Sequence, residues 1–262
     1  WFFVPCFRTE LPQGEKKKEP SKDGSFFLPS SAKTAYLFLP PHRIQQQNRV
    51  EVYDMEGSQN YVELWGIAGS DPAFSHENHA RRFDKFPLRV ERLSGQSDVP
   101  IIVANEALLR TYPVSEGQSL RVTGQLRSFN NKSGQGSKLV ITVFAQSIEP
   151  GDGTYFNRIL LSGALCKKPS LRKTPLGRSI CDLILAVNRH YGRADYLPCI
   201  AWGQTAMQIA EMDVGDRLTI EGRVQSRAYT KQLETGSEER TAFEVSVMQL
   251  VEETEDPNVE RS

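Results

Sequence analysis

The chain contains an internal repeat of domain length, which constrains its fold more than any other feature. Asn60–Gly66 (NYVELWG) aligns with Asn157–Gly163 (NRILLSG), 97 residues further on. Other matching residues keep this spacing, or a spacing of 98 after one inserted residue: Pro72 and Pro169, Asp98 and Asp195, Gly124 and Gly222, Ser128 and Ser226. A spacing kept over this length is typical of a duplicated structural unit. We therefore expect one domain at residues 58–150 and a related domain at residues 155–250.

Each repeat unit has the pattern of a small all-β domain. In the second unit, five runs mix β-branched and apolar residues with a period of two and end at Gly, Pro or charged residues. The expected strands are Ile159–Leu165, Ile180–Val187, Leu197–Trp202, Leu218–Val224 and Phe243–Leu250. A short helix is expected over Thr205–Met212. In the first unit, Asn105 can cap a helix over Glu106–Thr111 in the same slot.

Five short strands with a helix between the third and the fourth are the plan of an OB-fold. The expected fold class is therefore all-β with short helices, arranged as two tandem five-stranded OB-fold barrels. Hairpins of this fold form a groove that binds oligonucleotides or oligosaccharides.

The two ends of the chain lie outside the repeat. Residues 1–54 show no sustained periodicity and are expected to be disordered, or to be a non-native extension that precedes a true start at Met55. Residues 251–262 form a short acidic segment, which we interpret as a solvated tail.

Composition and motifs argue against several classes of function. No apolar run approaches the length of about 18 residues that a spanning helix needs, so no membrane partner is expected. The cysteines lack metal-ligand spacing and are interpreted as reduced residues of a cytoplasmic protein. His76 and His79 lie near Glu77 and Asp84 but are best explained as polar hairpin residues. With no phosphate loop, G-x-S-x-G or H-E-x-x-H motif, we expect no enzyme, no metal and no cofactor.

Positive charge is concentrated in the second unit, although the whole chain has 32 basic and 32 acidic residues. From Arg158 to Tyr229, eleven Lys and Arg face six Asp and Glu, whereas residues 60–150 have ten against nine. Single-stranded nucleic acid requires cations for its phosphates and flat side chains for its bases. The second unit interleaves both: Arg189, Tyr191, Arg193, Trp202, Arg223, Arg227 and Tyr229.

Five segments of the second unit occur in an order and spacing that resembles a known family: Asn157–Gly163, Lys168–Gly177, Leu185–Arg189, Ala201–Gly203 and Glu221–Tyr229. They resemble the bacterial single-stranded DNA-binding protein (SSB) family. The resemblance implies four aromatic residues that stack on single-stranded DNA: Tyr191, Tyr196, Trp202 and Tyr229. It also implies DNA-binding cations at Arg172 and Arg227. Neighbouring cations complete the expected site: Lys173, Arg189, Arg193 and Arg223.

The first unit resembles this family mainly through the internal repeat. Val99 takes the slot of Tyr196, Val103 or Ala104 that of Trp202, and Asn131 that of Tyr229. Its own candidates for single-stranded DNA binding are Phe74, Phe83, Phe86, Arg127 and Phe129. These phenylalanines could bind DNA, pack the barrel or form a subunit interface. We expect the second unit to carry most of the affinity and the first to act mainly in assembly.

We therefore expect a protein that binds and coats single-stranded DNA without sequence preference, in replication, repair, recombination or mobile-element transfer. Two alternatives stay open: a replisome or primosome protein-interaction module, and an OB-type RNA binder. The resemblance also implies a homodimer with four OB-folds, with Tyr61 and Leu64 of the first strand as candidate contacts. Replication or recombination proteins are further candidate partners.

Overall fold

The computed structural model describes residues 59–131, 137–189, 192–233 and 236–251. The expectations for residues 1–54 and for the acidic tail from residue 252 lie outside these residues, as does Tyr191. None of the helices in the described ranges has the length and apolar character needed to cross a membrane.

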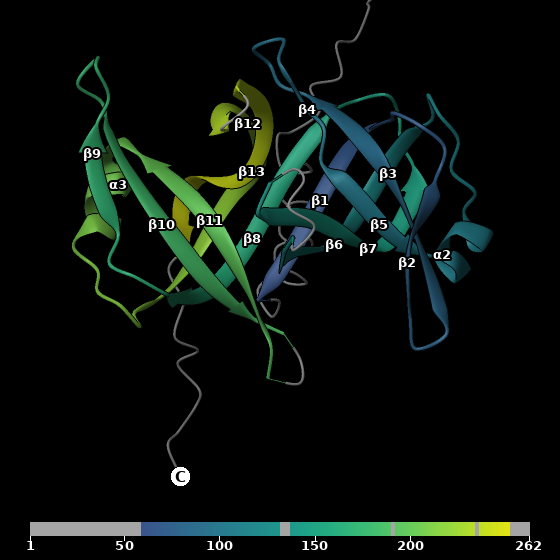
Figure 1. The fold of residues 1–262 in the computed structure, drawn as a ribbon, viewed down its shortest axis with the longest axis horizontal. Coiled ribbons are helices and arrows are strands. Elements are labelled where there is room, and N and C mark those ends of the chain that lie inside the picture. Colours follow the sequence, from purple (N-terminus) through teal and green to yellow (C-terminus); the bar gives the residue numbers. More distant parts are fainter. Residues whose placement is uncertain (1–58, 132–136, 190–191, 234–235, 252–262) are drawn as a thin grey trace, which may run out of the picture. The chain divides into compact units, whose positions relative to one another are not determined.

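In the first repeat unit, strand pairings close a ring of five strands, which we call the first barrel (Figure 1). Its strands are β1 (Asn60–Ala68), β3 (Arg81–Glu91), β5 (Ile101–Asn105), β6 (Ser119–Asn130) and β7 (Leu139–Pro150). The ring runs β1–β3–β5–β7–β6 and returns to β1, with β5 and β7 parallel. Three short elements complete the unit: β2 (Ala73–Asn78), β4 (Ser97–Asp98) and α2 (Glu106–Thr111).

A second ring, the second barrel, repeats this order in β8–β10–β11–β13–β12. Its strands are β8 (Phe156–Leu165), β10 (Ser179–Asn188), β11 (Ala194–Trp202), β12 (Arg217–Leu233) and β13 (Gly236–Val251). The unit also contains β9 (Ser170–Lys173) and α3 (Gly203–Ala210). The expected all-β class with short helices is confirmed. The last two strands are much longer than expected, because their hairpin continues beyond the apolar core positions.

The starts of the two helices can be compared with the local sequence signals that predicted them. Helix α2 begins as expected, and the Asn105 side chain accepts a hydrogen bond from the Leu108 N–H at 2.7 Å. Helix α3 begins two residues earlier than expected. Gly203 has a φ of +60°, which lets the chain turn from β11 directly into the helix without a side-chain cap.

Repeated glycines mark the places where each ring closes. A Cβ on Gly66 would lie 2.4 Å from the Arg89 carbonyl oxygen, and one on Gly163 would lie 2.6 Å from the Ala186 carbonyl oxygen. No side chain fits at such a distance. The glycines therefore let β1 approach β3, and β8 approach β10, at equivalent points of the two barrels.

Alternate residues of the strands fill the interior of each barrel. Phe86 is only 1% exposed and Leu64 is fully buried. Of the three roles that the sequence left open for Phe86, packing of the barrel is therefore the one that the structure supports, and a contact with DNA is excluded. The expectation that Leu64 contacts a second copy of the chain is wrong, because its side chain is buried in the barrel.

The two barrels are joined edge to edge by β1 and β8. These strands pair antiparallel from Asn60 opposite Leu161 to Trp65 opposite Phe156. The first strand of each unit is therefore used within the chain itself.

Candidate nucleic-acid interface

A buried carboxylate of each barrel accepts hydrogen bonds from the neighbouring barrel. Asp98 of β4 accepts hydrogen bonds from the N–H of Ser226 at 2.7 Å and from its hydroxyl at 2.9 Å. It also accepts one from Arg92 Nε at 2.6 Å. The Asp98 side chain has no exposed area. The carboxylate thus links the first barrel to β12 of the second.

The reciprocal contact uses Asp195 of β11, which is also fully buried. Asp195 accepts hydrogen bonds from the Ser128 N–H at 2.5 Å, from Arg189 Nε at 2.5 Å and from Arg127 Nη1 at 3.2 Å. Its partner Ser128 lies on β6 of the first barrel. We call the Asp98 and Asp195 contacts the carboxylate joints.

Both carboxylate joints favour the ionised acid. Burial by itself raises the pKa of Asp98, but the hydrogen bonds from Arg92 and Ser226 outweigh it and lower the pKa. Burial likewise opposes the hydrogen bonds that Asp195 accepts from Arg189, Ser128 and Arg127, and its pKa is again lowered. The joints are therefore charged at neutral pH.

Three of the four expected stacking aromatics are described, all in the second barrel. The side chain of Tyr196 is 54% exposed and that of Trp202 is 41% exposed. Tyr229 is half-buried, and its hydroxyl lies 3.4 Å from Ser137 Oγ on the first barrel. The backbone of Tyr196 is held across the joint, because its N–H donates to Ser128 Oγ at 2.9 Å.

One expected equivalence between the barrels is wrong. Trp202 is the residue before α3, and the residue before α2 is Asn105, 97 positions earlier. The slot of Trp202 therefore falls on Asn105, and not on Val103 or Ala104, which both lie in the buried part of β5.

The expected cations of the second barrel differ in their availability. Arg172 forms an ion pair with Asp182 at 2.6 Å, and Arg227 lies 3.9 Å from Glu244. Arg189 is held in the joint by Asp195. The remaining cations are Lys173 and Arg193, which are exposed, and Arg223, which is half-buried.

The expected residues of the first barrel also separate into groups. Phe74 and Phe129 are 56% and 52% exposed, whereas Phe83 is 9% exposed. Arg127 reaches the Asp195 joint. Phe83, Arg127 and Phe129 line one groove with a volume of about 810 Å³, and Phe74 does not.

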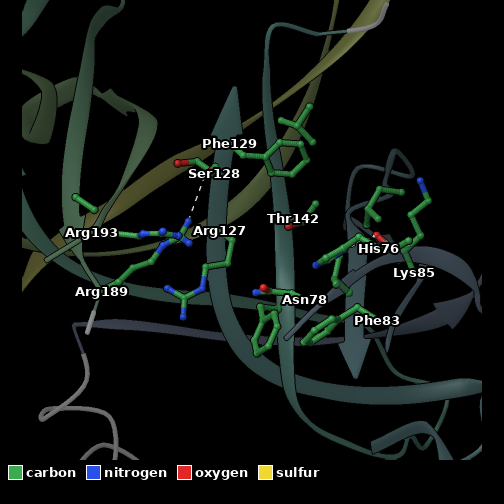
Figure 2. Close-up of a pocket in the computed structure, with 16 residues that line it drawn as sticks. His76, Asn78, Phe83, Lys85, Arg127, Ser128, Phe129, Thr142, Arg189 and Arg193 are labelled. Atoms are coloured by element: carbon green, nitrogen blue, oxygen red, sulfur yellow. Dashed lines mark hydrogen bonds between the residues drawn. The ribbon is translucent and has the colours of Figure 1, made fainter. Parts of the chain in front are cut away.

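This groove lies over β3, β5, β6 and β7 and receives residues from the second barrel. Figure 2 shows Arg127, Arg189 and Arg193 gathered on one side of it and His76, Phe83 and Lys85 on the other. The sequence pattern indicated no site role for Lys85 or Phe144, and it indicated only a polar hairpin residue at His76. Phe144 follows three buried residues of β7, and no local pattern distinguishes it from a core residue. Within the described ranges, no three His, Cys, Asp or Glu side chains are grouped so as to hold a metal ion.

Comparisons with known proteins agree on the second barrel. Residues 156–251 match the model of the single-strand binding protein family. The single-stranded DNA-binding protein of Halalkalibacterium halodurans is 33% identical over 99 residues, which cover 35% of this chain and 56% of that protein. That of Clostridium tetani is 38% identical over 80 residues, which cover 28% of this chain and 55% of that protein. The chain thus spans about half the length of these relatives.

A solved structure resembles the chain over a greater length. A deletion mutant of the single-stranded DNA binding protein from Thermus aquaticus matches with a TM-score of 0.58 and 25% identity. The match covers 77% of this chain and 98% of that one.

Fold and surface together define a protein of the OB-fold class, as expected from the strand pattern. The second barrel matches the single-strand binding protein family, which confirms the resemblance carried by its five sequence segments.

Proposed function

We propose that this protein binds and coats single-stranded DNA without sequence preference and catalyses no reaction. The observation that carries the proposal is the second barrel. Its residues 156–251 match the single-strand binding protein family, and Tyr196 and Trp202 present exposed rings at two of the four stacking positions. Base stacking on such rings is tolerant of sequence, because every base has a flat face. Replication, repair, recombination and mobile-element transfer all generate the single strands that this activity requires.

Titration of the full chain with dT oligomers of increasing length tests the proposal. We expect tight binding that weakens steeply with salt, since bound phosphates release counterions. A duplex of equal length is the control and should bind far more weakly, because its bases are not available for stacking. Equal competition by duplex, or affinity that is independent of salt, would contradict the proposal. Preference for rU over dT would instead support the RNA-binding alternative, and failure to bind either would support the protein-interaction module.

We propose further that the chain is a cytoplasmic homodimer. The free thiols of Cys166, Cys181 and Cys199 suit a reducing compartment. Strand β1 is already paired with β8, so a second copy must use another surface. Light scattering at micromolar concentration should give twice the mass of one chain, and the mass of a single chain would contradict the dimer. Replication or recombination proteins remain proposed further partners.

A further inference from the structure

The outer face of the second barrel, which carries Trp202, also carries two carboxylates. Residues that pair directly across neighbouring strands share a face, as do residues two apart along a strand. Asp182 of β10 pairs with Ile200 of β11, two residues before Trp202. Ile200 is also paired with Ser246 of β13, two residues after Glu244 (Figure 1). Asp182 and Glu244 therefore lie on the same face as the exposed ring of Trp202.

Glu244 lies between the two exposed aromatic rings of this face. Strands β11 and β13 are parallel, and their register places Glu244 level with Pro198. Along β11, Pro198 is two residues from Tyr196 and four from Trp202. At the ordinary rise of a strand, Glu244 is therefore about 7 Å along the face from the first ring and about 13 Å from the second. A DNA strand whose bases stack on both rings passes close to Glu244.

The two carboxylates differ in the hydrogen bonds that they accept. Both oxygens of Asp182 accept from Arg172, from Nε at 2.6 Å and from Nη2 at 3.3 Å. Glu244 Oε1 accepts from Gln225 Nε2 at 2.8 Å. Glu244 Oε2 accepts no hydrogen bond from the residues that the structure describes, and Arg227 Nε lies 3.9 Å from it. Asp182 is thus occupied by Arg172, whereas Glu244 has one oxygen available for a donor from a ligand.

The position of Glu244 favours contact with a base over contact with a phosphate. Its side chain is 12% exposed, compared with 42% for Asp182, and the hydrogen bond from Gln225 holds it in place. A fixed negative charge repels phosphates but not uncharged bases. By strand register, the equivalents of Asp182 and Glu244 in the first barrel are Lys85 and Thr142, so this pair of acids belongs to the second barrel.

The chemistry of a carboxylate oxygen selects among the bases. Such an oxygen only accepts hydrogen bonds, so the base that it binds must present a donor. Cytosine and adenine present an exocyclic amino group where thymine presents a carbonyl oxygen. A carbonyl oxygen beside Glu244 Oε2 would bring two acceptors together and leave both without a donor. The carboxylate can therefore distinguish bases that stacking on Tyr196 and Trp202 does not.

We infer that Glu244 gives the second barrel a preference for bases with an exocyclic amino group, cytosine and adenine, over thymine. This inference rests on the proposed function and deepens it. Stacking on the rings holds any base, and Glu244 Oε2 adds a hydrogen bond for the amino-bearing bases. Arg227 is 60% exposed and is free to turn towards a phosphate while Glu244 contacts the base.

The test titrates the full chain with four oligomers of equal length: dT, 5-methyl-dC, dU and dC. The first two carry the ring methyl group and the last two lack it, so each pair compares a carbonyl with an amino group on otherwise matched bases. The readout is the ratio of the affinity for the amino oligomer to that for the carbonyl oligomer. Because it is a ratio, changes that affect all four oligomers alike cancel.

Glu244→Gln should lower this ratio about tenfold in both pairs, the size expected for one hydrogen bond to a charged group. Gln225 still donates to the side-chain oxygen at position 244, so the amide nitrogen of the variant takes the place of Oε2. A donor then faces the base, and the preference should turn towards dT and dU. A ratio that stays at the parent value in Glu244→Gln would overturn the inference.

Asp182→Asn is the matched control, because it removes a carboxylate of the same face whose oxygens are occupied by Arg172. It should change the affinity for all four oligomers by the same factor and leave the ratio unchanged. An equal fall of the ratio in Asp182→Asn and Glu244→Gln would assign the preference to the net charge of the face, and the role of Glu244 would be wrong.

A second variant protects the test against a failure to fold. Glu244→Thr copies Thr142, the equivalent residue of the first barrel, and should also lower the ratio. If Glu244→Gln does not fold, a ratio at the parent value in Glu244→Thr would overturn the inference by itself. A parent chain that binds all four oligomers equally would overturn it as well. If the parent binds none of the four, the proposed function itself fails.

Discussion

The two barrels have the same scaffold and different surfaces. Asn60 of the first barrel exchanges two hydrogen bonds with the backbone of Leu126, at 2.8 Å each, and Asn157 does the same with Val224 at 2.8 and 2.9 Å. The ring-closing glycines and the carboxylate joints are repeated in the same way. The outer residues differ: the second barrel presents Tyr196 and Trp202, whereas the first presents Phe129 beside a groove that contains no carboxylate.

This comparison separates two kinds of constraint on a duplicated chain. Residues that close the ring or join the barrels are confined by backbone contacts, because an unpaired buried polar group would destabilise either barrel. The identity of surface residues is not restricted in this way. Aromatic residues can therefore occur at different positions of the two barrels and still lie on one continuous surface.

The largest expected effect concerns the carboxylate joints. Asp195→Asn removes the charge that Arg189 and Arg127 contact, so it should lower the free energy of unfolding by about 3 kcal/mol. Asp98→Asn should do the same if the joints are equivalent. Asp182→Asn, in an exposed ion pair, is the control and should cost less than about 1 kcal/mol. Urea denaturation measures all three, and unequal losses at Asp98 and Asp195 would break the symmetry of the joints.

Lowering the pH should reproduce part of this loss in the free energy of unfolding. Asp98 and Asp195 have lowered pKa values in the folded chain, so the unfolded chain binds more protons in the acid range. The stability from these groups is complete above the ordinary aspartate pKa of about 4 and falls as the pH drops below it. Urea denaturation at several pH values should show this decline. The decline should be shallower in a chain with both aspartates changed to Asn, and an identical decline would assign it to other groups.

The next largest effect is expected at Trp202 and Asn105, which occupy equivalent positions directly before the helix of each barrel. Trp202→Ala should weaken dT binding by about 1–3 kcal/mol, and Trp202→Tyr should be tolerated. Asn105→Ala should leave dT binding unchanged but cost about 1 kcal/mol of stability, because it removes the cap of α2. Fluorescence titration and thermal unfolding measure the two outcomes. If Trp202→Ala unfolds the chain or binds normally, Trp202 is a packing residue.

The smallest effect concerns one position with opposite charges in the two barrels. Lys85→Asn should weaken binding of long dT by about 1 kcal/mol or less, and Asp182→Asn should strengthen it by a similar amount. Asp182→Asn also releases Arg172 from its ion pair. If both variants changed the affinity for long dT in the same direction, the two surfaces would not contact the same DNA strand.

The scaffold could be predicted from the sequence because its signals are local or repeated. The alternation of apolar residues predicted the strands, Asn105 predicted the start of α2, and the spacing of 97 predicted equivalent units. The surface was predicted less well. Phe86 has the same sequence character as Phe129, yet it points into the barrel, since side chains alternate between the two faces of a strand.

The sequence by itself thus determined the all-β class, the succession of strands and helix along the second unit, and the family that this unit resembles, because these depend on residue type and spacing along the chain. Only the tertiary structure decided that Asp98 and Asp195 join the barrels and that Phe129 lies beside Tyr196. It also decided that His76, Lys85 and Phe144 share a groove with Arg193. The residues brought together across the two barrels lie 49 to 128 positions apart, and hydrogen bonding and packing between strands bring them together, which no local pattern records.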